Sequence, residues 1–211
     1  MKRIVILLVL FWAGNTIAYG KTERFGTWIE LEFRKDFLER FSFSLSPEIR
    51  LQDQFKPDEF LLQGKLSYEP ISLIKLAAAY RVNTERKERG NVTFYRYAFD
   101  AHIKKDIGRF EAALRGRYTN FSETYEVTSE KFLRPRAKLE YDIKGNKIRP
   151  HIGCELFHNM TKKETHKIRY EVGFTRKLKG PHRIELYFRL HDYFTDKASI
   201  HILGIKYRMK F

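Results

Sequence analysis

Histidine and serine are the residues of this 211-residue chain whose types could support acyl transfer. An acyl hydrolase needs a nucleophile, a base and an orienting group within hydrogen-bonding distance of one another. The candidates for base and orienting group are His102, His151, Glu155 and His191, and those for the nucleophile are Ser42, Ser44 and Ser46. No histidine shares a segment with these serines, and the chain has no G-x-S-x-G motif. We therefore predict no catalytic residues, and keep an enzyme acting on lipid or lipopolysaccharide acyl chains as an alternative.

The spacing of possible metal ligands is also unfavourable. His151 and Glu155 are four residues apart, a spacing that on a β-strand separates them by about 13 Å. The single cysteine, Cys154, cannot form a cysteine-based zinc site or a disulfide framework. On an apolar face it is a small hydrophobic residue. We expect no metal and no cofactor.

Apolar and polar residues alternate from Thr27 to the end of the chain. In residues 110–118, for example, Leu114 belongs to the apolar set, and Arg115 and Arg117 belong to the polar set. A period of two is typical of β-strands with two unlike faces. Eleven such segments can be counted, and no stretch has the period of a helix. The pattern predicts one all-β domain over residues 21–211.

The first twenty residues have the layout of a signal peptide. Lys2 and Arg3 precede an apolar run over residues 4–13, and the small residues Ala18 and Gly20 follow it. The apolar run is shorter than the roughly 20 residues that a membrane-spanning helix needs. We predict cleavage after Gly20, with cleavage after Ala18 as the alternative, and export of the mature chain.

The predicted strands are longer than the five or six residues of an average soluble strand, and they match a tilted, bilayer-spanning strand of about nine to eleven residues. In a membrane barrel the apolar face contacts lipid, the charged face lines the lumen, and closure pairs every strand edge. The pattern predicts a single closed antiparallel transmembrane β-barrel. Because single-chain bacterial barrels usually have an even strand number, we expect about 10–12 strands. A soluble periplasmic β-barrel that binds an apolar ligand remains an alternative.

The connectors between the segments alternate in length. Residues 104–108 and 144–146 form short connectors with turn residues, and residues 84–91, 122–130 and 191–199 form longer polar ones. We therefore expect one rim of tight turns and one rim of loops, with the first strand starting at the loop rim. Basic residues in the longer connectors, such as Lys162 and Lys163 after residue 159, could contact lipopolysaccharide phosphates.

The net charge of +15 is spread along the polar faces rather than gathered in one block. This mixing with acidic residues argues against a nucleic-acid partner. The charged residues predicted to line the lumen are Arg115, Arg117, Arg134, Arg136, Lys138, Arg149, Arg169, Glu111, Glu140, Glu155 and Glu171. Side chains largely fill the interior of a narrow barrel, so we expect a mostly occluded lumen. Any residual conductance should prefer anions.

Three short stretches resemble the "domain of unknown function 2490" family. They are Phe25-Gly26-Thr27-Trp28, Gly108-Arg109-Phe110 and Leu203-Gly204-Ile205-Lys206-Tyr207. The resemblance extends along nearly all of the mature chain. It implies a small outer-membrane β-barrel, found mostly in Bacteroidota, and brings no established activity and no catalytic residues. The expected partners are outer-membrane lipid, lipopolysaccharide and the machinery that inserts barrels into that membrane.

The chain ends on an aromatic residue in phase with the last alternating segment. Tyr207, Met209 and Phe211 share one face there, as expected of a signal that the insertion machinery engages.

Deleting Phe211 should lower the amount of protein in the outer membrane and leave export intact, because only the terminal signal is lost. Quantitative immunoblotting of outer-membrane and periplasmic fractions measures both steps. Parental outer-membrane levels of the shortened chain would show that Phe211 is not an assembly signal.

Overall fold

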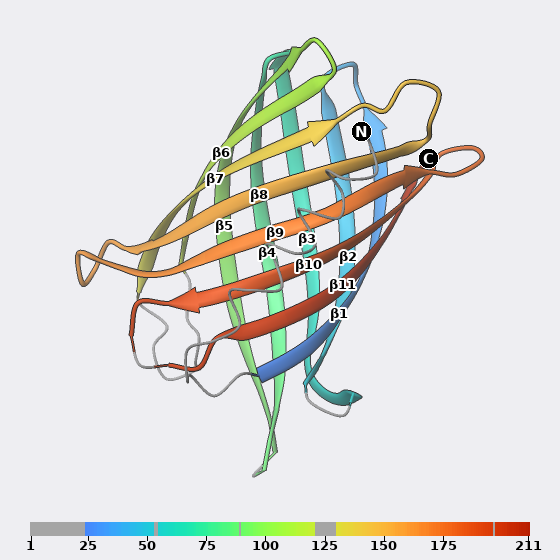
Figure 1. The fold of residues 1–211 in the computed structure, drawn as a ribbon. Coiled ribbons are helices and arrows are strands. Elements are labelled where there is room, and N and C mark those ends of the chain that lie inside the picture. The colour runs from blue at the N-terminus through green and yellow to red at the C-terminus, as the bar shows by residue number, and fades with distance from the viewer. Residues whose placement is uncertain (1–23, 53–54, 89, 121–129, 196) are drawn as a thin grey trace.

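Eleven β-strands form one closed sheet in the computed structural model, which describes residues 24–52, 55–88, 90–120, 130–195 and 197–211 (Figure 1). The strands are β1 (Arg24–Phe37), β2 (Phe41–Gln52), β3 (Lys56–Ile71), β4 (Ile74–Lys87), β5 (Gly90–Ile107), β6 (Phe110–Asn120), β7 (Lys131–Tyr141), β8 (Ile148–Asn159), β9 (Glu164–Lys177), β10 (His182–Tyr193) and β11 (Ile200–Lys210). Within these ranges no helix is long and apolar enough to cross a membrane. The expected all-β barrel is confirmed, and the expected signal peptide lies outside the described residues.

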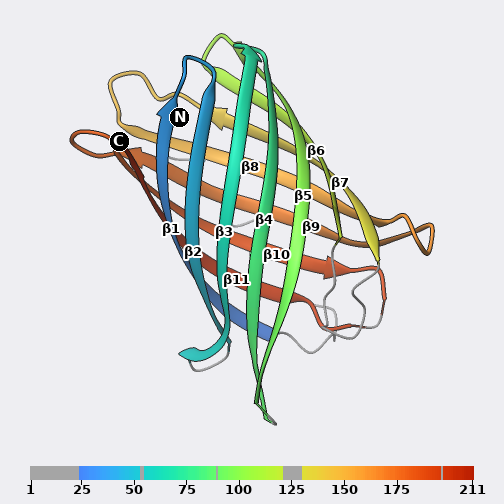
Figure 2. The same cartoon turned by 180° about the vertical axis from the view of Figure 1, so that it is seen from behind.

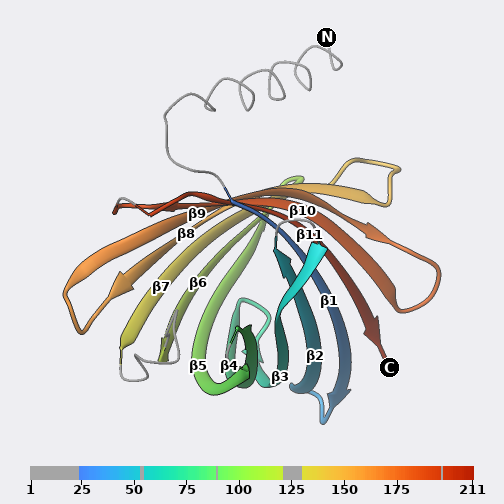
Figure 3. The ribbon, with the colours of Figure 1, turned by 90° about the horizontal axis from the view of Figure 1, so that it is seen from below.

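The strand order is a simple meander in which each strand pairs with its neighbours in sequence. Figure 2 shows β1 to β5 side by side, and Figure 3 shows β3, β4 and β5 on the wall opposite β8 to β11. β1 also pairs with β11, from Arg24 beside Ile200 to Arg34 beside Lys210, and this pairing closes the barrel.

The closing pair departs from the antiparallel barrel that the sequence predicts. β1 and β11 run parallel, and the other ten pairs are antiparallel. The reason is parity: in an up-and-down meander of eleven strands, the first and last strands point the same way. Arg24 and Lys210 consequently lie at opposite ends of the barrel. These ends are called the Arg24 rim and the Lys210 rim below.

Tight turns make the Lys210 rim, where residues 38–40, 72–73, 108–109, 142–147 and 178–181 connect the strands. Gly108, Gly145 and Gly180 have φ angles of 62°, 74° and 69°, a region that glycine adopts without steric penalty. The first strand starts at the opposite rim, as the alternation of connectors predicts.

Three of the predicted connectors include residues that belong to strands. In the connector predicted over residues 191–199, residues 191–193 belong to β10. Residues 84–87 and 90–91 continue β4 and β5 as an extended hairpin rather than a loop, and Glu85 pairs with Val92 there. Residues 104–107 belong to β5, so that Gly108 and Arg109 alone form the turn. These residues are mostly polar and were therefore predicted to form loops. A paired strand end that is exposed to water can be polar on both faces.

Alternate residues of each strand point into and out of the barrel. On β6, Leu114 is 58% exposed on the outside, whereas Arg115 points inward and contacts Glu155 of β8. On β10, Tyr187 is buried and the ring of Phe188 is half exposed. The core of this molecule is therefore its charged and polar interior, and the outer surface carries the large apolar side chains.

Candidate functional site

Charged side chains fill much of the barrel interior. Glu155 is 2% exposed and Lys167 is 3% exposed. Burial of a charge is costly unless an opposite charge or hydrogen bonds compensate it. The interior must therefore contain a network of ion pairs, and this network is the candidate site.

Glu155 of β8 is the centre of the largest group of ion pairs. Its carboxylate accepts from Arg115 of β6 at 2.5 Å and from Arg134 of β7 at 2.9 Å. Arg169 of β9 contacts its other oxygen at 3.2 Å. One carboxylate thus holds three guanidinium groups from three different strands, and the group keeps a positive surplus.

Two aromatic rings, Trp28 and Phe157, make cation–π contacts with the buried arginines. Arg134 lies 4.1 Å from the centre of the fully buried Phe157 ring. Arg50 of β2 lies 4.0 Å and Arg189 of β10 lies 5.4 Å from the centre of the Trp28 ring of β1. Stacking of a cation on an aromatic face is more favourable when water is excluded. The rings therefore help to balance a surplus of cations that the carboxylates leave.

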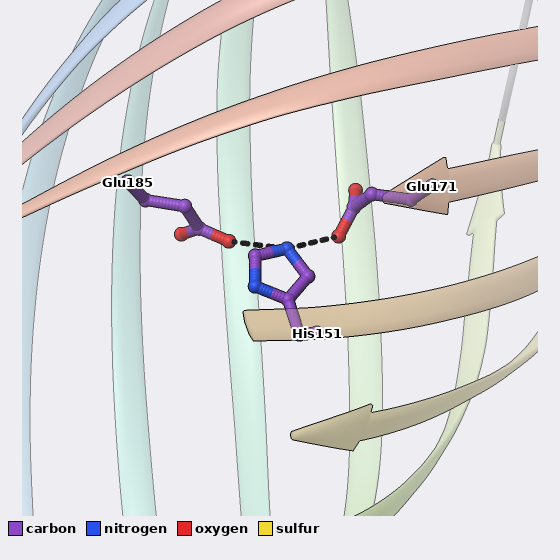
Figure 4. Close-up of side chains that lie close together, drawn as sticks. All are labelled: His151, Glu171 and Glu185. Carbon is purple, nitrogen blue, oxygen red and sulfur yellow. Dashed lines mark ion pairs between the residues drawn. The ribbon is translucent and has the colours of Figure 1, made fainter. Parts of the chain in front are cut away.

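His151, Glu171 and Glu185 lie together on β8, β9 and β10 (Figure 4). The Nε2 atom of His151 lies 3.4 Å from Glu171 Oε1 and 3.3 Å from Glu185 Oε1. These three atoms are close enough to share a metal ion. The sequence analysis considered His151 only together with Glu155 and did not predict this group. The group joins residues whose proximity depends on strand pairing rather than on spacing along the chain.

Basic residues already surround this histidine–glutamate group. Arg136 and Arg189 each approach Glu171 to 2.6 Å, and Lys138 approaches Glu185 to 3.2 Å. Three fixed positive charges against two carboxylates make the group a poor host for a divalent cation. The ion pairs instead cross-link strands β7 to β10.

A cavity of about 420 Å³ lies in the Arg24 half of the lumen. Arg24 and Gln52 line it at the rim, and Lys65 and Lys206 line it deeper inside. Lysine and arginine side chains outnumber aspartate and glutamate side chains along its wall. The cavity is therefore suited to an anion rather than to a cation or an apolar ligand.

The structure places all eleven predicted lumen residues on the inner faces of their strands, and six of them line the cavity. Arg115, Arg117, Arg134, Arg136, Arg169 and Glu155 line the cavity. Lys138, Arg149, Glu111, Glu140 and Glu171 do not; among them, Arg149 pairs with Glu140 at 3.5 Å and Lys104 pairs with Glu111 at 2.6 Å. Arg117 pairs with Asp100 of β5, a partner that the prediction did not include.

Sequence reasoning missed the half of the site that β1 to β4 contribute. Trp28, Arg50, Lys65 and Arg81 line the cavity. Each lies on the polar face of its alternating segment, so the same periodicity would have indicated them.

The three residues of the predicted assembly signal lie at the end of β11. The hydroxyl of Tyr207 lies 2.7 Å from Nδ1 of His182 on β10. Met209 pairs with Phe33 of β1. The side chain of Phe211 is exposed, and its backbone N–H donates to the carbonyl of Arg34 at 2.9 Å. The last residue thus fastens β11 to β1 at the closure.

Replacing Glu155 with Gln should destabilise the barrel by about 3–5 kcal/mol, because three buried guanidinium groups lose their shared counter-charge. The matched control is Glu111→Gln, whose partner Lys104 is about half exposed and whose loss should change stability by about 0–1 kcal/mol. Urea titration of the purified barrels in detergent measures both. Equal stability of the two variants would contradict the central role of Glu155.

Comparison with known proteins adds one match. A family model described as "Protein of unknown function (DUF2490)" matches residues 25–199. Neither the curated proteins nor the solved structures contain a match to this chain. The family model covers most of the chain and the first ten strands of the barrel, and it confirms the predicted family. Two of the three short stretches lie within the matched residues, and the stretch over residues 203–207 lies outside them. The chain therefore belongs to the DUF2490 family of proteins of unknown function.

Proposed function

We propose that this protein spans the bacterial outer membrane as a small β-barrel without enzymatic activity. The observation that carries the proposal is the inverted polarity of the barrel. Leu203 is 61% exposed and Phe99 is 56% exposed on the outside, whereas Glu155 is buried inside. Large apolar side chains on the outer face of a closed sheet favour contact with lipid chains rather than with water.

The same polarity argues against the soluble alternative. A soluble barrel that stores an apolar ligand has an apolar interior and a polar outside, the reverse of the arrangement here. Arg134 and Glu171, both buried, would face such a ligand. Retention in the outer membrane is tested by cell fractionation and by the gel shift that folded barrels show on heating. A protein recovered in the soluble periplasmic fraction would contradict the proposal.

The arrangement of the interior serines and histidines does not favour the enzyme alternative. Ser42, Ser44 and Ser46 are buried on β2, and neither β1 nor β3 contains a histidine. The buried histidines have other neighbours: His191 accepts a hydrogen bond from Arg169 at 2.7 Å, and His151 lies between two glutamates. We therefore propose a structural or accessory role, with a narrow lumen that side chains largely fill.

The proposed partners follow from the two surfaces of the barrel. The outer apolar face would contact outer-membrane lipid, and the end of β11 would engage the insertion machinery. Lys162, exposed between β8 and β9, pairs with Glu130 at 2.8 Å. This hydrogen-bonded pair raises the pKa of the Lys162 amine. The amine is charged at neutral pH even without this shift, and we propose that it contacts lipopolysaccharide phosphates.

Replacing Leu114 with Arg should lower the stability of the barrel in a bilayer by about 2–4 kcal/mol, because Leu114 lies near the middle of β6 on the outer face. The control is Ile107→Arg at the end of β5, for which the loss should be about 0–1 kcal/mol, as near the membrane interface. Reversible unfolding in lipid vesicles gives both values. Equal losses of stability in the two variants would contradict the proposal that the outer face of the barrel contacts lipid.

Single-channel recording tests the lumen. The protein should show small conductance steps at most, with a preference for anions that weakens as salt screens the fixed charges. Replacing both Arg134 and Arg136 with Ala should reduce this preference, whereas Lys104→Ala at the Lys210 rim should not. A large, steady, cation-selective pore in the parent protein would contradict both the occlusion and the charge assignment.

A further inference from the structure

Two small residues lie side by side on the wall of the cavity. Ala79 of β4 and Ala98 of β5 pair directly, and both line the cavity. Lys65 of β3 lies beside Ala79, and Thr119 of β6 lies beside Ala98. The four residues form one row across the sheet, with a long side chain only at the Lys65 end. The two alanines are called the alanine floor below.

Long basic side chains border the alanine floor on both sides. Arg81 and Arg96 pair directly one step toward the Arg24 rim, and Arg117 lies one step toward the Lys210 rim. Strands lie about 4.8 Å apart and alternate residues about 7 Å apart along a strand. Lys65 and these arginines are therefore all within reach of a small group seated on the floor.

The charges around the floor are incompletely balanced. Arg117 is bound by Asp100 through two hydrogen bonds of 2.6 and 2.7 Å. Arg81 donates to the neutral Gln63 at 3.1 Å, and its nearest carboxylate, Glu48, is 3.9 Å away. Arg81 and Arg96 lie directly opposite each other, and like charges in this arrangement destabilise a sheet.

Lys65 is the decisive residue. Among the residues that the structure describes, it makes no hydrogen bond and no ion pair. The carboxylate that attracts the Lys65 ammonium most strongly is that of Glu32. Glu32 already contacts Lys206 at 2.5 Å and Arg208 at 2.9 Å. The Lys65 ammonium therefore has three donors available to a ligand in the cavity.

We propose that the alanine floor, with Lys65, Arg81 and Arg117 around it, binds a phosphate group. A doubly charged tetrahedral oxyanion matches several converging cationic donors, whereas a carboxylate would satisfy fewer of them. The cavity of about 420 Å³ leaves room for a small substituent on that group. The site is independent of the membrane location proposed above and is tested on the purified barrel itself.

Isothermal titration of the mature protein in detergent with inorganic phosphate, at constant ionic strength, tests the site. Saturable binding is expected, and Lys65→Met should weaken it by about tenfold or more, the usual effect of a lost hydrogen bond to a charged group. Lys104→Met, which removes an equal charge outside the cavity, should leave the affinity within about twofold, since only screened long-range attraction is lost. Absence of saturable binding, or equal loss in both variants, would overturn the proposal.

A second variant guards against a folding defect. Ala98→Leu keeps every charge but fills the alanine floor, and it should abolish phosphate binding while the heat-shifted gel band persists. Titration with glycerol 3-phosphate separates a phosphate monoester from the free ion: binding of either probe that depends on Lys65 supports the site. Binding in Ala98→Leu equal to that of the parent would place the phosphate elsewhere and overturn the proposal.

Discussion

Buried arginines repel one another unless carboxylates lie between them, and this requirement organises the interior of the barrel. On β6 and β7, Arg115 pairs with Arg136 and Arg117 pairs with Arg134, which alone would be destabilising. The compensating carboxylates come from other strands: Asp100 of β5 pairs with Arg117, and Glu171 of β9 pairs with Arg136. Glu155 of β8 is the most heavily used of them. Charge balance thus links strands that share no backbone hydrogen bonds.

Aromatic rings complete the balance where carboxylates are too few. Trp28 of β1 and Phe157 of β8 lie beneath guanidinium groups, and Arg169 lies near both rings, 5.7 Å and 4.9 Å from their centres. A ring offers a negative face without carrying a formal charge of its own, so it holds an arginine and leaves the net charge of the lumen positive. Most arginines of the cavity have protein contacts. The cavity still attracts anions, because the rings do not neutralise the charge of these arginines.

Much of the fold could be predicted from the alternation alone. It placed Leu114 outside and Arg115 inside, and it gave a strand number that the structure reproduces. The parallel closure of β1 and β11 follows from the odd count, which the even-number rule for bacterial barrels obscured. Alternation with a period of two predicts whether a residue faces the lumen or the outside of the barrel, and it does so on every strand.

The contacts across the lumen could not be predicted in this way. Arg115 and Glu155 are 40 positions apart, and their meeting depends on how far each strand is staggered against the next. The stagger of a barrel is set by its closure, which no single segment encodes. The same holds for His151 between Glu171 and Glu185 and for Lys65 beside Ala79. Local pattern therefore identified the residues of the interior but not their partners.

The parallel closure also places the two ends of the sheet at opposite rims, whereas an up-and-down barrel with an even strand number has both ends at one rim. Because Arg24 and Lys210 lie at opposite rims, a chain of this topology in a bilayer begins on one side and ends on the other. Two reporter domains fused to the ends would be held on different faces of the same membrane, about one bilayer thickness apart. If the barrel spans a membrane as we propose, it would be a compact scaffold that displays one fusion partner to each aqueous compartment.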